Sequence, residues 1–63
     1  MAAFADFAAC ETRVKAKIAD GTWITGHAAR NQAGTLCVRV QRPMSPTHPD
    51  YGAWTEITDD ATA

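Results

Sequence analysis

The chain has 63 residues, with six Lys and Arg against seven Asp and Glu, a net charge of −1 and 46% hydrophobic residues. This length allows one small domain, residues 1–63, and is too short for a cofactor-binding α/β unit, a nucleophile elbow or a kinase-like lobe. No apolar stretch reaches the roughly 20 residues that span a bilayer, and the start lacks the basic residues and apolar run of a secretory signal. We therefore expect a soluble cytoplasmic protein that is not an enzyme.

Stability is a concern for a domain of this size, because the burial of apolar surface barely offsets the entropy of ordering the chain. Disulfides, metals or self-association supply the difference in most small folds. Cys10, Cys37, His27 and His48 are scattered and lack the short paired spacings of a zinc site. We expect no metal, no cofactor and two reduced thiols, with a single disulfide as the alternative, and we expect self-association to contribute to stability.

The N-terminal residues 1–11 are rich in Ala, and their larger apolar residues recur at helical spacing. Phe4, Phe7, Ala8 and Glu11 follow the i, i+3, i+4, i+7 pattern of a helix with one apolar edge. The sequence predicts a short helix here that docks on a sheet, and the alternative is a frayed arm that becomes ordered on a partner.

From Thr12 the apolar period changes to two, which is typical of a half-buried strand. Val14, Ala16 and Ile18 alternate with basic residues, and Asp20-Gly21 follows as a hairpin signal. A two-residue turn would place Ile18 opposite Trp23 in a second strand over 22–25. Gly26 then marks a bulge or a bend in that strand.

The second half of the chain alternates between breakers and short strand patterns. Residues 27–34 are expected to form a connection or a single helical turn, and residues 36–40 form the clearest strand. Pro43, Pro46 and Pro49 recur at the spacing of a polyproline II edge, either as a ligand for an aromatic groove or simply as a loop. Residues 54–58 are predicted as a closing strand and 59–63 as a flexible acidic tail.

Together these elements predict a mainly β fold in one domain, with a helix over 1–11, a sheet or barrel over 12–58 and the tail over 59–63. The sheet would be a strongly bent antiparallel one, or an SH3/Sm-like barrel, of four to five strands.

Charge is segregated along the chain. Residues 13–42 hold all six basic residues and one acidic residue, whereas residues 1–12 hold two acidic residues and residues 43–63 hold four. Such a basic sheet face could meet phosphates or an acidic protein surface, and its alternative is a solvated face that protects an edge strand from aggregation. A pI near 6.0 weighs against tight nonspecific DNA binding. The candidate binding face is Arg13, Lys15, Lys17, Arg39 and Arg42.

Aromatic residues supply the remaining candidates. With few large hydrophobic residues available, we expect Trp23 in the core and Trp54 partly exposed, with Tyr51 and Trp54 as aromatic contacts for a partner. His27 with either cysteine lacks an orienting third group and an oxyanion hole, so the sequence offers no catalytic residues.

The pattern Val14, Ala16, Ile18, Asp20-Gly21 and Gly26, preceded by a short helix, resembles the first motif of the Sm-like barrels. More loosely it is similar to SH3-like barrels and to the small bacterial Rho-inhibitor family. The resemblance covers roughly residues 4–40 and implies a small barrel and RNA binding. Residues 27–36 lack the aspartate and asparagine that the family uses around its RNA-binding loop, and a proline-rich stretch replaces the second motif, so no RNA-binding residue is carried over.

Our leading expectation is a noncatalytic protein-binding module that self-associates or docks on a larger bacterial protein as an adaptor or inhibitor. This role would suit a protein encoded by a phage or mobile element. The alternative is an Sm-like or SH3-like RNA-binding protein that uses the basic face. A small enzyme whose active site forms only between subunits is a third class, without support in these residues.

Overall fold

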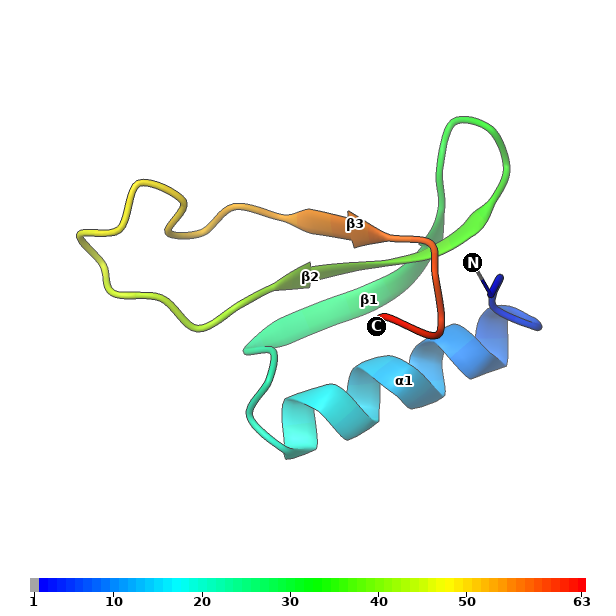
Figure 1. Cartoon of the computed structure of the whole chain (residues 1–63), viewed down its shortest axis with the longest axis horizontal. Helices are drawn as coiled ribbons and strands as arrows, with labels where there is room; N and C mark the ends of the chain where they lie inside the picture. Colours follow the sequence, from blue (N-terminus) through cyan, green and yellow to red (C-terminus); the bar gives the residue numbers. More distant parts are fainter. Residues whose placement is uncertain (1) are drawn as a thin grey trace.

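The computed structural model describes residues 2–63 as one helix packed on one face of an antiparallel sheet (Figure 1). The elements follow in the order α1 (Phe7–Ala19), β1 (Thr25–Arg30), β2 (Leu36–Gln41) and β3 (Thr55–Ile57). Their spatial order is β1-β2-β3, so β2 is the central strand and β1 is an edge. A small β-rich fold with an N-terminal helix is therefore confirmed. Across residues 2–63 the sheet has three strands and lies uncurled, against four to five strands expected.

The helix is longer than predicted and lies later in the chain. Asp6 is its N-cap and accepts a 2.8 Å hydrogen bond from the backbone N–H of Ala9. The prediction of a helix over 1–11 followed by a strand from residue 12 was wrong, because residues 12–19 continue α1. Cys10 and Val14, four positions apart, are the buried residues of the helix, and this spacing places both on the face that meets the sheet.

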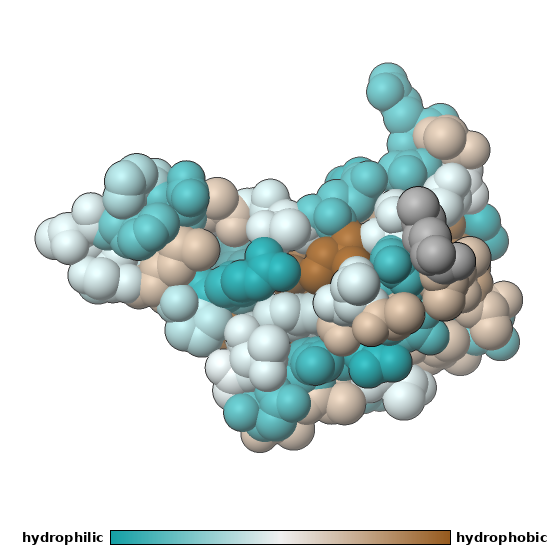
Figure 2. Space-filling model, in the orientation of Figure 1, coloured by the Kyte–Doolittle hydropathy of each residue, from teal (hydrophilic) through white to brown (hydrophobic). Residues whose placement is uncertain are grey.

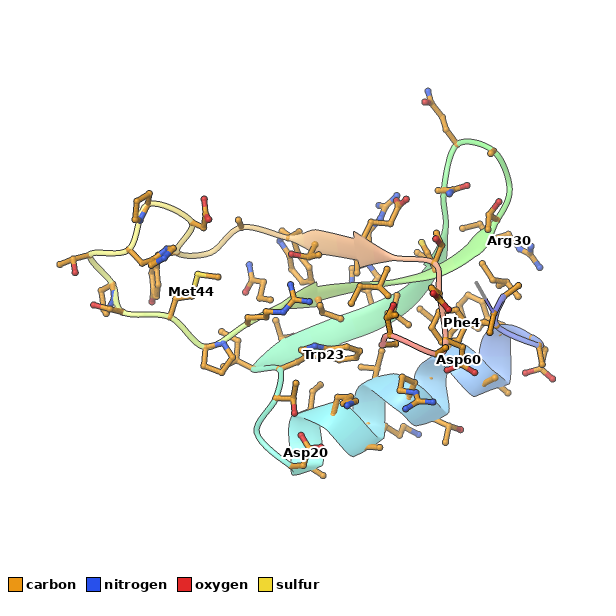
Figure 3. The ribbon with its side chains drawn as sticks, in the orientation of Figure 1. Phe4, Asp20, Trp23, Arg30, Met44 and Asp60 are labelled. Atoms are coloured by element: carbon orange, nitrogen blue, oxygen red, sulfur yellow. The ribbon has the colours of Figure 1, made fainter. Side chains whose placement is uncertain are left out.

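The Asp20-Gly21 pair ends the helix and does not form the predicted hairpin turn. The Asp20 backbone N–H donates to the Ala16 carbonyl at 3.1 Å, and Gly21 follows with a φ of +84°. This is the helix C-terminus that glycine favours, since a residue without Cβ adopts positive φ at little cost. In Figure 3, Asp20 marks the end of α1 where the chain turns back toward the sheet.

The first strand of the sheet was largely missed. β1 pairs with β2 in a regular antiparallel register from Thr25 opposite Gln41 to Arg30 opposite Leu36. Residues 27–30, predicted as part of a connection, therefore belong to the sheet. The connection is the short turn after Arg30, in which Asn31 Oδ1 accepts 3.0 Å hydrogen bonds from the N–H groups of Ala33 and Thr35.

Gly26 lies within β1 where α1 packs closely on the sheet, and it marks no bulge in the register. A Cβ at this position would lie 3.0 Å from Val40 Cγ1, 3.2 Å from the Arg39 carbonyl oxygen and 3.3 Å from Val14 Cγ1. Glycine is needed here because a side chain would occupy the space that α1 and β2 fill.

The core lies between α1 and the sheet. Trp23 is only 2% exposed, which confirms its prediction as a core residue, and Figure 3 shows its side chain between α1 and the strands, with Phe4 at the opposite end of the layer. The buried cluster is Phe4, Cys10, Val14, Trp23, Val38 and Val40. Ile57 and Ala63 pack against it from the C-terminal part.

The strands predicted near 36–40 and 54–58 are confirmed as β2 and β3, with β3 shortened to three residues. Between them, the proline-rich residues extend beyond the sheet as a long loop (Figure 1). Backbone hydrogen bonds from His48 to Ser45, from Tyr51 to His48 and from Ala53 to Asp50 fold this loop into successive turns. The loop therefore departs from the continuous polyproline II segment that the proline spacing suggested.

Residues 59–63, predicted as a flexible tail, are tied to the N-terminal part of the chain. Asp59 Oδ1 accepts a 2.9 Å hydrogen bond from the Ala2 backbone N–H, and Asp59 forms a β-bridge with Ala3. The Asp60 carboxylate binds Arg13 of α1. These contacts bring the two ends of the domain together beside the helix (Figure 1).

Candidate binding site

No helix or strand within residues 2–63 covers the sheet face opposite α1. Side chains alternate between the two faces of a strand, and Val38 and Val40 point into the core. His27, Arg39 and Glu56 therefore lie on the open face, where the strand register places them in a row across β1, β2 and β3. This row crosses the centre of the sheet.

The row and Trp54 line a shallow hollow of about 370 Å³, which we call the open-face site. The rings of His27 and Trp54 lie 5.3 Å apart between centroids and are tilted by 59°. Arg39 Nη2 lies 3.7 Å from Glu56 Oε1, with both side chains more than 40% exposed. The site thus offers an aromatic surface, a guanidinium and a carboxylate that remain accessible to a partner.

Neighbouring hydrogen bonds restrain Glu56 and the segments next to the site. Asn31 Nδ2 donates to Glu56 Oε2 at 3.4 Å, and Arg42 Nη1 donates to Thr55 Oγ1 at 3.1 Å. Gln41 Nε2 donates to the Gly52 carbonyl at 2.7 Å and so links β2 to the long loop. Glu56 is thus the site residue that is restrained from outside the site, which lowers the entropic cost of ordering its side chain on binding.

The predicted aromatic contacts are both exposed. Trp54, directly before β3, is 51% exposed, as predicted, and Tyr51 is 57% exposed in the long loop three residues earlier. The surface in Figure 2 is mostly hydrophilic or neutral, with one strongly hydrophobic area over the sheet. Trp and Tyr are among the residue types that contribute most binding energy at protein interfaces, so both exposed side chains are candidate contacts for a partner.

The five predicted basic residues are divided between two elements. Arg13, Lys15 and Lys17 lie on α1, whereas Arg39 lies on β2 and Arg42 directly follows it. The helix covers the sheet face opposite to the one that carries Arg39, so the five side chains do not form one sheet face. Arg13 is bound by Asp60, and Arg39 lies beside Glu56.

Both cysteines are free and fully buried. Burial raises the pKa of the Cys10 thiol and of the Cys37 thiol, and the Glu56 carboxylate raises that of Cys37 further. Protonated, buried thiols are poor nucleophiles. Within residues 2–63, no three His, Cys, Asp or Glu residues come together in a way that could hold a metal ion.

A second surface, not identified from the sequence, lies between α1 and the free edge of β1. A groove of about 320 Å³ separates a stripe of helix residues from Gly26, His27 and Ala28 of β1. The stripe consists of Phe7, Glu11, Val14, Lys15 and Ile18. Phe7 and Ile18 are 46% and 39% exposed. The i, i+4, i+7, i+8, i+11 spacing would have revealed this stripe if residues 12–19 had been assigned to a helix.

None of the helices described for residues 2–63 has the length and apolar character needed to cross a membrane. Comparison of the chain with protein-family models, curated proteins and solved structures finds no match.

Proposed function

We propose that this chain is a noncatalytic binding module that docks on a larger protein through the open-face site and the adjacent Tyr51 and Arg42, as an adaptor or inhibitor. The observation that supports this proposal is the uncovered sheet face, with exposed Trp54 beside Arg39 and Glu56. Trp, Tyr and Arg are the side chains that dominate binding energy at protein interfaces.

The charge and shape of the site favour a protein surface with mixed polarity. Arg39 and Glu56 offer one donor group and one acceptor group side by side, and the ring of Trp54 can pack against apolar atoms. A partner strand or loop that lies across the row would meet all three within the width of the sheet.

A second candidate function, RNA binding by an Sm-like or SH3-like domain, is favoured by Trp54 and the two nearby arginines. An exposed ring on an open sheet can stack on an unpaired base, and Arg39 and Arg42 can contact phosphates. We rank this candidate second, because Lys15 and Lys17 lie on the helix, away from that face, and Glu56 would repel phosphate. A barrel would also need more strands than the three described.

The experiment that tests the proposal places a photo-crosslinking amino acid at position 54 and, as a control, at exposed position 19 on α1, which covers the other face of the sheet. A specific protein partner should crosslink at position 54 alone. Binding of the purified partner should then weaken at least tenfold in Trp54→Ala and Arg39→Ala, and change little in Lys17→Ala, which removes the same charge from the helix.

Titration of the protein with single-stranded RNA at low and at high salt distinguishes RNA binding from protein binding. Binding that falls steeply with salt and is lost in Trp54→Ala would favour RNA over protein. Absence of both a crosslinked partner and RNA binding would contradict a binding role for the open face.

A further inference from the structure

The outer edge of β1 has free backbone hydrogen-bonding groups. The Asn31 N–H donates to the Thr35 carbonyl at 3.0 Å, in the same register that pairs the rest of β1 with β2. Since bonding alternates along an antiparallel strand, His27 and Ala29 bond to β2, whereas Gly26 and Ala28 direct their N–H and C=O groups away from it. β1 contains no Lys, Pro or bulge of the kind that blocks edge pairing.

The groove beside this edge carries apolar groups at its two ends and charges between them. Phe7 lies at one end of the helical stripe and Ile18 at the other, with Glu11 and Lys15 in the middle. When two such helices lie antiparallel about a twofold axis at the middle of the stripe, Glu11 of each copy faces Lys15 of the other. Phe7 of each copy then meets Ile18 of the other. The stripe is therefore complementary to itself in both charge and apolarity.

We propose that two copies of this chain associate through their β1 edges, with the twofold axis perpendicular to the sheet near His27. The two sheets join into one continuous antiparallel sheet, with Gly26 of each copy bonded to Ala28 of the other, and the two α1 helices lie side by side on one face. Gly26 has no Cβ and Ala28 carries only a methyl group, so neither fills the groove beside α1. His27 lines both the groove and the open-face site, whereas Arg39, Trp54 and Glu56 line only the open-face site, so the interface leaves these three residues accessible to a partner.

The spacing of the elements permits this arrangement. Paired strands lie about 4.8 Å apart, whereas packed helices need about 8–10 Å. In this chain α1 packs against β2 as well as β1, which sets its axis back from the edge. The two helices consequently have room to meet through their side chains, and Phe7 and Ile18 become buried.

Native mass across a wide concentration range gives the first test. We expect the wild-type chain to change from one chain to two between low micromolar and millimolar concentrations. Phe7→Ser should weaken association roughly tenfold or more, because a buried apolar contact occurs twice in a twofold interface. Ile24→Ser, which changes a more exposed side chain outside the groove, and Trp54→Ala should leave association unchanged.

Charge reversal gives a sharper test, because mixing two variants can restore an association that each variant alone has lost. Glu11→Lys and Lys15→Glu should each weaken association roughly tenfold, since each places like charges opposite one another at two symmetric contacts. An equimolar mixture of the two variants should form mixed dimers. One variant then carries positive charges at positions 11 and 15 and the other carries negative charges at both, so every facing pair is of opposite sign. Circular dichroism confirms that each variant is folded before mixing.

Amide hydrogen exchange locates the contact. The Ala28 amide should become protected as concentration rises, whereas the Ala29 amide, already bonded to β2, should be protected at every concentration. A wild-type chain that stays monomeric at millimolar concentration would overturn the proposal. So would a closed ring of several subunits, or an association that neither charge reversal weakens.

Discussion

Arg13 and Asp60, 47 positions apart in the sequence, are joined by two hydrogen bonds that tie the C-terminal segment to the middle of α1. Arg13 donates to Asp60 Oδ1 from Nη2 at 2.9 Å and from Nε at 3.2 Å. This contact gives the predicted basic residue Arg13 a structural role in place of a free binding role. It also explains why the last residues lie against the core.

Replacing Arg13 by Met or Asp60 by Asn should destabilise the fold by about 0.5 kcal/mol, the size typical of a partly exposed ion pair. Both side chains are more than a third exposed, so solvent screens the pair. Urea denaturation of the two single variants and the double variant measures the coupling energy, which should shrink in high salt. Lys15→Met removes a charge from the same helix and serves as the control. A coupling energy of zero at low salt would show that the pair is only a surface contact.

Acidification should weaken the same junction through Asp59. Hydrogen bonds from the N–H groups of Ala2 and Ala61 hold the pKa of the Asp59 carboxyl below its ordinary value. A carboxyl whose pKa is lower in the folded state adds stability above its unfolded pKa near 4, and this stability is lost as the pH falls through the folded value. We expect the free energy of unfolding to drop below pH 4.

The control for this pH effect is Asp59→Asn, which removes the titrating group but keeps the side-chain shape. The drop in stability below pH 4 should be smaller in this variant, although Asp20, whose pKa is also lowered by its bonds from Thr22, still contributes. Identical pH profiles for the variant and the wild type would contradict the role of Asp59. Melting temperatures measured between pH 2 and pH 7 provide the comparison.

The Asp20-Gly21 pair shows where sequence reasoning succeeded and where it failed. The expected two-residue hairpin turn favours positive φ at both residues, but Asp20 has a φ of −88° and only Gly21 has a positive φ, of +84°. A single glycine in this conformation is typical of a helix C-terminus. Residues 12–19 fit both periods, since Val14 and Ile18 alternate with basic residues and also lie four positions apart. Ala, Lys and Arg favour helix in such a segment, and burial of Cys10 with Val14 decides in favour of the helix.

At position 21, the effect of a substitution on stability should depend on whether the new residue is an L- or a D-amino acid. A Cβ at Gly21 meets nothing within 4 Å, so only backbone strain opposes a side chain. Gly21→Ala should destabilise the fold by about 1–2 kcal/mol, because L-residues disfavour positive φ. D-alanine at the same position, introduced by chemical synthesis, should stabilise the fold by about 0.4–1 kcal/mol. Equal melting temperatures for the two forms would contradict a positive φ at this position.

Only part of the sheet was predicted, because one of its strands lacks a strand pattern in its own sequence. β2 alternates β-branched and polar residues and was identified from its sequence, whereas β1 contains Gly and Ala residues with little strand propensity of their own. β1 is a strand because β2 offers it a paired edge and α1 covers one of its faces. The sequence consequently did not identify His27 as a residue of the open-face site, whereas it did identify Arg39 and Trp54 as candidate binding residues.

Gly26→Ala should destabilise the fold by more than the addition of a single methyl group suggests. The added methyl would lie 3.0 Å from Val40 Cγ1 and 3.2 Å from a backbone oxygen, so α1 and β2 must move apart to admit it. Overpacking of this kind costs about 1–3 kcal/mol. In a chain that already carries Val40→Ala, the added methyl has more room, so Gly26→Ala should lower the free energy of unfolding by less than it does in the wild type. A Gly26→Ala variant as stable as the wild type in urea would contradict the close contact between helix and sheet.

The two buried thiols should report on opening of the fold. Cys10 and Cys37 have no exposed surface, and burial raises the pKa of each thiol, so a thiol reagent at pH 8 should modify them only through unfolding. Labelling should be slow in buffer, rapid in denaturant and faster in Gly26→Ala in proportion to its loss of stability. A cysteine placed at exposed Gln32 gives the unprotected rate for comparison. If Cys37 were labelled as fast as this control residue, the open sheet face would admit reagents to its centre and the thiol would not be protected by the fold.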